Sequence, residues 1–113
     1  MKLLTQKLLQ QLPATAQASQ AKDPTVWIKF FYPDFSWTWF ACGYDPADDI
    51  CWGLVDGDEI ELGSFSLSEL KATRGKLGYS LERDYYFAPR PLSQLVQELK
   101  QQYPTRTIWG WSD

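Results

Sequence analysis

Four runs of aromatic and β-branched residues follow one another between residues 26 and 65, with short polar segments between them. Such residues favour strands, and the Pro, Asp and Gly in the separating segments favour turns. The predicted strands are residues 26–32, 37–42, 50–55 and 59–65. Consecutive strands joined by connections this short pair antiparallel, so the pattern predicts an antiparallel meander.

Two short helices are predicted from capping signals. Thr5 is placed to cap a helix over residues 6–12, which Pro13 ends. Ser66 followed by Glu69 has the spacing of a capping box, in which each side chain accepts a hydrogen bond from a free N–H group at the helix start. This second helix is expected over about residues 67–73.

A third helix and a fifth strand are predicted in the C-terminal half. Apolar residues recur at helical spacing between residues 92 and 102 and predict an amphipathic helix, which Pro104 closes. Residues 81–88 are predicted to form a fifth strand, stopped by two prolines. Residues 105–111 form either a last short strand or an exposed arm.

These elements define an α+β fold: an antiparallel sheet of about five strands with helices packed on it, on one face. At 113 residues the chain has room for one core, so a single domain covers residues 1–113. Within it we expect an N-terminal helix and mobile segment over residues 1–23, a core over 24–103 and a tryptophan-containing tail over 104–113.

Composition excludes several classes of function. The chain has no histidine, which rules out histidine general bases and histidine-ligated metals. Its two cysteines lack the spacing of a zinc site, so we expect no metal and no cofactor. A net charge of −3 argues against nucleic-acid binding, which depends on Lys and Arg. No apolar stretch approaches the roughly 20 residues of a membrane span, so a cytoplasmic protein is expected.

The second predicted strand is apolar on both faces. Trp37, Trp39 and Ala41 point one way, and residues 38, 40 and 42 point the other way. One interpretation is a central strand covered on both sides. The other is an exposed aromatic patch for a partner. The candidate binding residues are Trp37, Trp39, Arg83, Trp109 and Trp111.

Cys42 and Cys51 lie symmetrically about the loop between the second and third strands. In a regular hairpin they would face each other, at a distance that a disulfide can bridge. In a reducing cytoplasm the favoured interpretation is two free, buried thiols.

Three consecutive charged residues, Glu82-Arg83-Asp84, form the clearest polar cluster of the sequence. On a strand, Glu82 and Asp84 share one face, where they can flank a substrate, and Arg74 can pair with either carboxylate. Glu82, Asp84 and Arg74 are therefore candidate catalytic residues. The competing interpretation is a structural ion pair that holds a helix to the sheet.

Several short motifs, taken in order, resemble a known family. Residues 61–70 read ELGSFSLSEL, and Arg74-Gly75, Leu77-Gly78 and Leu81-Glu82-Arg83-Asp84 follow. Earlier motifs are Met1-Lys2-Leu3-Leu4-Thr5, Lys29-Phe30-Phe31, Asp45-Pro46 and Gly53-Leu54-Val55-Asp56. Up to about Pro91-Leu92-Ser93 the chain resembles the bacterial domain of unknown function 2958. The resemblance implies a domain that often travels on plasmids and other mobile elements, and it implies no chemistry.

Three functional hypotheses follow. The leading one is a non-catalytic module that binds another protein, because common catalytic residue types are missing and aromatic residues are in excess. The alternatives are an enzyme that uses a Glu/Asp/Arg cluster, and a mobile-element factor that inhibits a host defence protein.

Overall fold

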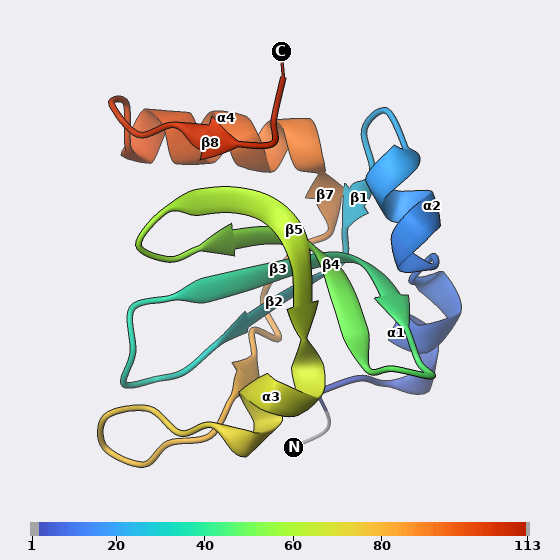
Figure 1. The fold of residues 1–113 in the computed structure, drawn as a ribbon, viewed down its shortest axis with the longest axis vertical. Helices are drawn as coiled ribbons and strands as arrows, with labels where there is room; N and C mark the ends of the chain where they lie inside the picture. Colours follow the sequence, from blue (N-terminus) through green and yellow to red (C-terminus); the bar gives the residue numbers. More distant parts are fainter. Residues whose placement is uncertain (1–2, 113) are drawn as a thin grey trace.

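A six-stranded sheet forms the centre of the protein (Figure 1). The structure is a computed structural model that describes residues 3–112, so Met1 and Lys2 of the N-terminal motif and Asp113 of the tail lie outside the described residues. The strand order is β6-β2-β3-β4-β5-β8. The strands are β2 (Ile28–Phe31), β3 (Thr38–Asp45), β4 (Ile50–Asp56), β5 (Ile60–Ser66), β6 (Glu82–Arg83) and β8 (Ile108–Trp109).

The described chain also contains four helices and a small second sheet. The helices are α1 (Gln6–Gln11), α2 (Thr15–Gln20), α3 (Leu67–Ala72) and α4 (Leu92–Gln102). The predicted first strand is divided: β1 (Thr25–Val26) pairs with β7 (Arg90–Pro91), and β2 pairs with β3. The α+β class is confirmed. The sheet is mixed, because β8 pairs parallel with β5.

Helices cover both faces of the sheet, so the expectation of one covered face was wrong. Alternate residues of β3 enter two separate cores. Phe40 packs in one core with the apolar face of α4, and Trp39 packs in the other core with Leu8 of α1 and Leu67 of α3. The apolar character of β3 on both faces is therefore explained by burial on both sides.

The starts of α1 and α3 carry the predicted hydroxyl caps, whereas those of α2 and α4 are held by carboxylates from distant segments. The Thr5 hydroxyl accepts a hydrogen bond from the Leu8 N–H, and the Ser66 hydroxyl accepts one from the Glu69 N–H. At α2 the cap comes from a distant strand. The carboxylate of Asp45 accepts hydrogen bonds from the N–H and the hydroxyl of Thr15. At α4, Asp23 accepts hydrogen bonds from the N–H and the hydroxyl of Ser93.

The predicted fifth strand, residues 81–88, is mostly wrong. Only Glu82–Arg83 forms a strand, paired antiparallel with Phe30 and Phe31 of β2. The chain turns after this pair, because the carboxylate of Asp84 accepts a hydrogen bond from the Tyr86 N–H, as aspartate does in turns.

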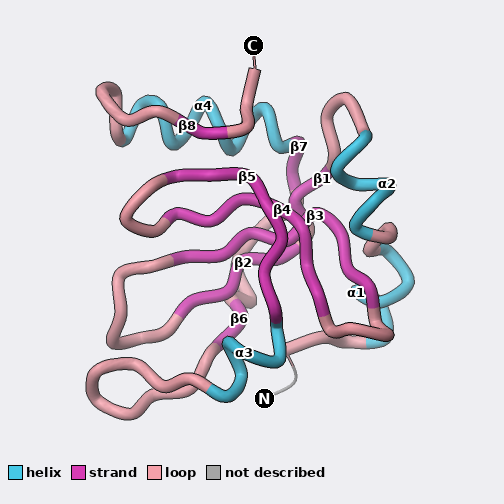
Figure 2. Tube along the Cα trace, viewed as in Figure 1, coloured by secondary structure: helices cyan, strands magenta, loops and turns pink. Residues whose placement is uncertain are grey.

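The tail is a short docked strand and not an exposed arm. β8 lies beside β5, as Figure 2 shows. Arg106 fixes the approach to β8, because its guanidinium donates hydrogen bonds to the carbonyls of Gly57 and Asp58 in the β4–β5 turn. The longest described helix, α4, has 11 residues, and no described helix has the length and apolar character needed to span a bilayer.

Cys42 and Cys51 do not face each other. The β3–β4 pairing shifts by one residue between Ala41 and Gly43, so Cys51 lies opposite Tyr44. The shift is a β-bulge, in which an extra residue is inserted into one strand. Cys42 belongs to the α4 core and Cys51 to the opposite core, and both are buried and free.

Candidate functional site

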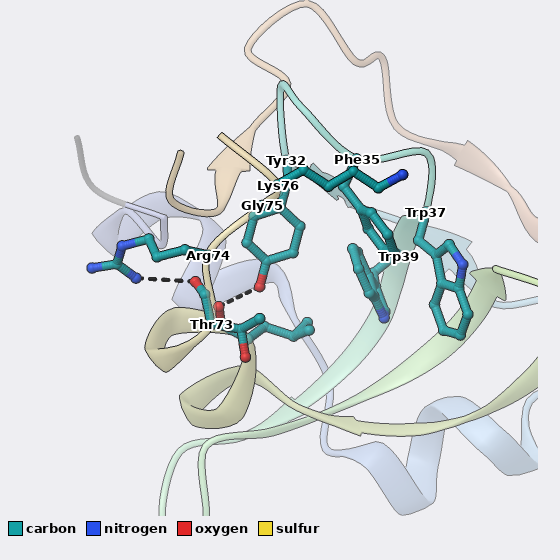
Figure 3. A pocket seen from close by; sticks show the side chains of 9 residues that line it. Tyr32, Phe35, Trp37, Trp39, Thr73, Arg74, Gly75 and Lys76 are labelled. Atoms are coloured by element: carbon teal, nitrogen blue, oxygen red, sulfur yellow. Dashed lines mark hydrogen bonds between the residues drawn. The ribbon is translucent and has the colours of Figure 1, made fainter. Parts of the chain in front are cut away.

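A pocket walled by aromatic rings lies between the β2–β3 hairpin tip and the end of α3 (Figure 3). Its volume is about 350 Å³. We call it the aromatic pocket. It is lined by Tyr32, Phe35, Trp37, Trp39, Leu70, Thr73, Arg74, Gly75 and Lys76.

The four rings contact one another in sequence around the pocket. Tyr32 meets Trp39 edge-on, with 5.6 Å between ring centroids, and Trp37 lies 6.0 Å from Trp39. Phe35 stacks on Trp37 at 6.1 Å. These are favourable aromatic separations. Trp39 and Tyr32 are buried, whereas Phe35 is 40% exposed, so the inner rings support the outer ones.

A tight turn and the strand period bring the rings together. The Phe35 N–H donates a hydrogen bond to the Tyr32 carbonyl across a turn at Pro33, as expected for a separating segment with Pro and Asp. This turn returns Phe35 toward Tyr32. Trp37 and Trp39 are two residues apart, so they point to the same face.

Tyr32 joins this hairpin to α3. Its hydroxyl donates a 2.5 Å hydrogen bond to the carbonyl of Leu70 in the last turn of the helix. The same carbonyl also accepts a hydrogen bond from the Thr73 N–H, so Tyr32 adds a second bond at the end of the helix. Burial raises the pKa of Tyr32, which keeps the hydroxyl protonated as a donor at neutral pH.

Asp34 holds the segment that forms the other wall. Its Oδ2 accepts hydrogen bonds from the N–H groups of Leu77 (2.5 Å) and Tyr79 (3.4 Å). Within that segment, the N–H of Gly75 donates to the carbonyl of Tyr79. The turn needs Gly78, whose φ of +91° lies in the left-handed region.

The two cations of the pocket point in different directions. Figure 3 shows Lys76 extending past Tyr32 toward Phe35 along the rim, whereas the head of Arg74 turns away from the rings. The Arg74 guanidinium donates to the carbonyls of Lys71 and Thr73 at the end of α3.

The three candidate catalytic residues do not form one site. Arg74 borders the aromatic pocket, and its guanidinium bonds to carbonyls, so the expected pairing with Glu82 or Asp84 was wrong. Asp84 lies 3.9 Å from the ammonium of Lys29, beside α1. Glu82 lines a different hollow, with Lys71. The Asp84 N–H still donates to the Lys29 carbonyl of β2, but the Asp84 carboxylate is held by the turn that follows, through the Tyr86 N–H.

The five candidate binding residues also lie in different parts of the structure. Trp37 and Trp39 meet in the aromatic pocket. Arg83 lies over the ring of Tyr85, with its guanidinium carbon 4.5 Å from the ring centroid. Trp109 is 55% exposed and donates from Nε1 to Glu59, whereas Trp111 is half-buried against the α4 core.

The sequence interpretation missed Tyr32, Phe35 and Lys76 as part of this site. A signal for the first two was present, because a proline turn between aromatic residues brings their side chains to one hairpin tip. For Lys76 there was none, because contacts of Asp34 and Tyr32 with distant residues place its segment beside the hairpin.

The pocket lining suits binding more than bond-breaking. None of the nine lining residues is an acid or a thiol, and the one hydroxyl besides Tyr32 belongs to Thr73. Among residues 3–112, no group of three or more Cys, Asp or Glu side chains is arranged to hold a metal ion.

The fold and the pocket together define a small α+β domain with an aromatic binding site. The chain matches the profile of a family described as a protein of unknown function (DUF2958) over residues 3–103, and it belongs to this family. No curated protein and no solved structure matches the chain.

Proposed function

We propose that this protein is a non-catalytic module that binds another protein, and that the aromatic pocket holds an apolar side chain of that partner. The observation that carries the proposal is a preformed pocket whose rim is partly exposed Phe35 and Trp37. Residues that dominate protein–protein binding are enriched in Trp, Tyr and Arg and gather in pockets. All three types line this one.

The size of the pocket favours a side chain over a cofactor. Small-molecule sites span roughly 300–1,000 Å³, and a pocket of about 350 Å³ is at the low end of that range. An enzyme built on Glu82, Asp84 and Arg74 receives no support, because those residues do not share a site.

We expect the protein to act in the cytoplasm and its partner to be a protein. Two buried free thiols suit a reducing cytoplasm. The net charge of −3 favours a protein over a nucleic acid as the partner. The hypothesis of a mobile-element factor that inhibits a host defence protein concerns the identity of this partner.

Site-specific cross-linking tests the surface and identifies the partner. A photoreactive phenylalanine analogue is placed at Phe35, or at Leu9 as the control, in a bacterial host. The two side chains are matched in exposure, at 40% and 38%. We expect one discrete adduct from position 35 and none from position 9, with the partner identified by mass spectrometry. Equal adducts from both positions would contradict a role for the pocket.

Affinity measured with the purified partner then tests the pocket itself. Trp37→Ala should weaken binding by about tenfold or more, as truncation of a dominant interface residue does. Trp109→Ala is the control, because Trp109 is also exposed but lies on β8. If Trp37→Ala binds as wild type does, the partner uses another surface.

A further inference from the structure

We infer that the apolar group bound in the aromatic pocket lies next to a carboxylate, and that Lys76 recognises this carboxylate. The inference rests on the proposed function and adds the chemistry of the partner segment. Such a segment has a large apolar or aromatic side chain with an acidic residue, or a chain end, directly beside it.

Lys76 differs from the ion-paired cations of the protein, since no carboxylate among the described residues pairs with it. Among the described residues, ion pairs join Lys29 to Asp84, Lys71 to Asp49, Arg90 to Glu98 and Arg106 to Asp56. Lys76 is exposed at the pocket rim and has no carboxylate within ion-pair distance in residues 3–112. Its ammonium therefore remains available to a ligand.

Asp34, the carboxylate that holds the pocket wall, is turned toward the backbone of that wall and makes no ion pair with Lys76. Asp34 directly precedes Phe35 of the pocket in the chain. Its Oδ2 accepts hydrogen bonds from the backbone N–H groups of residues 77 and 79. Arg74 borders the same wall, but its guanidinium is turned toward the carbonyls of Lys71 and Thr73. The cation that lies along the rim beside the rings (Figure 3) is thus the Lys76 ammonium, with which no carboxylate among residues 3–112 pairs.

The position of Lys76 disfavours a positively charged ligand. Four aromatic rings around a cavity suit a quaternary ammonium group, which binds to ring faces. Here Lys76 runs along the rim beside those rings, as Figure 3 shows, and it would repel a cation. An apolar group with a negative neighbour satisfies both the rings and the ammonium.

The test compares two probes that differ in one charge: N-acetyl-L-phenylalanine, with a free carboxylate, and its neutral amide. Binding is followed through the NMR signals of the Trp37 and Trp39 indole N–H groups. We expect the acid to bind about two- to fivefold more tightly than the amide, as an exposed ion pair allows. The difference should disappear at 1 M salt, where screening acts within about 3 Å.

Variants assign the preference to one side chain. Lys76→Gln should bind both probes equally, Lys76→Arg should keep the preference for the acid, and Lys7→Gln on α1 is the control that should change nothing. Equal binding of acid and amide to wild type would overturn this inference and leave the pocket intact. A preference for the acid over the amide that survives in Lys76→Gln would also overturn it. Tighter binding of tetramethylammonium than of the acid would do the same. Failure of both probes to shift either indole signal would overturn the pocket as well.

Discussion

Gly75 packs directly against the carboxylate of Asp34, and a Cβ at position 75 would overlap Oδ1. The glycine is required for this close approach between two segments, and the contact sets where the pocket wall stands. Arg74 and Lys76 flank the glycine, so the same contact places both cations at the pocket.

Gly75→Ala should therefore loosen the wall of the aromatic pocket. The added methyl group displaces the Asp34 carboxylate from the Leu77 N–H, and overpacking of this kind costs about 1–3 kcal/mol. Amide hydrogen exchange at Leu77 and chemical denaturation measure the two effects. Gly63→Ala is the control, since a Cβ there meets no atom within 4 Å. Equal stability of Gly75→Ala and wild type would contradict the tight contact.

The docking of α4 is tested by shortening a buried leucine. Leu95 is 3% exposed and packs in the core beneath the sheet, so Leu95→Ala should lower the free energy of unfolding by about 2–5 kcal/mol. Leu77→Ala makes the same chemical change at a side chain that is 79% exposed, and it should change stability by about 0.5 kcal/mol or less. Denaturant titration distinguishes the two variants, and an unchanged midpoint for Leu95→Ala would contradict the packing of α4.

Loss of the α3 cap should lower the free energy of unfolding by less than the Leu95→Ala change does. Ser66→Ala removes the hydroxyl that accepts from the Glu69 N–H and should cost about 0.5–2 kcal/mol. Ser80→Ala, at an exposed loop residue, provides the comparison. If thermal melts of the two variants coincide, the cap contributes nothing measurable.

Both cysteines should be unreactive in the folded protein. Burial raises the pKa of the Cys42 and Cys51 thiols to about 12, and the thiolate is the reactive form. We expect negligible alkylation of native protein at pH 8 and two alkylations after unfolding without reductant. Intact mass spectrometry reads both results; an unalkylated product lighter by two hydrogens would reveal a disulfide.

Acid should weaken the hydrogen bonds between Asp45 of β3 and Thr15 of α2. Hydrogen bonds from the Thr15 hydroxyl and N–H lower the pKa of Asp45 below its usual value of about 3.9. A lowered pKa in the folded state adds stability above the unfolded-state pKa, and this stability is lost as pH falls through the folded-state pKa.

Asp45→Asn should therefore melt below wild type at pH 7, and the two curves should converge as pH falls below about 4. Asp48→Asn, at an exposed position of the same loop, should follow wild type throughout. A constant difference between Asp45→Asn and wild type at every pH would show that the charge of Asp45 is not the cause.

Local chemistry in the sequence was enough to predict most elements. The capping box at Ser66 and Glu69 marked the start of α3, and the leucine spacing of residues 92–102 marked α4. Proline and glycine marked the turns of the central strands. These features succeed because each depends on residues within a few positions of one another, which the sequence displays directly.

The site and the cysteine geometry depended on contacts between distant segments. The bulge at Cys42 is a register shift between two strands, and the end of β6 depends on a side chain of the following turn. The wall of the aromatic pocket exists because Asp34 binds a segment more than 40 residues away, and Tyr32 binds the end of α3. The sequence by itself determined the central strands, the capped helices α1 and α3, and the amphipathic helix α4. The tertiary structure alone decided which of them meet, because side-chain hydrogen bonds and packing between segments carry no periodic signal along the chain.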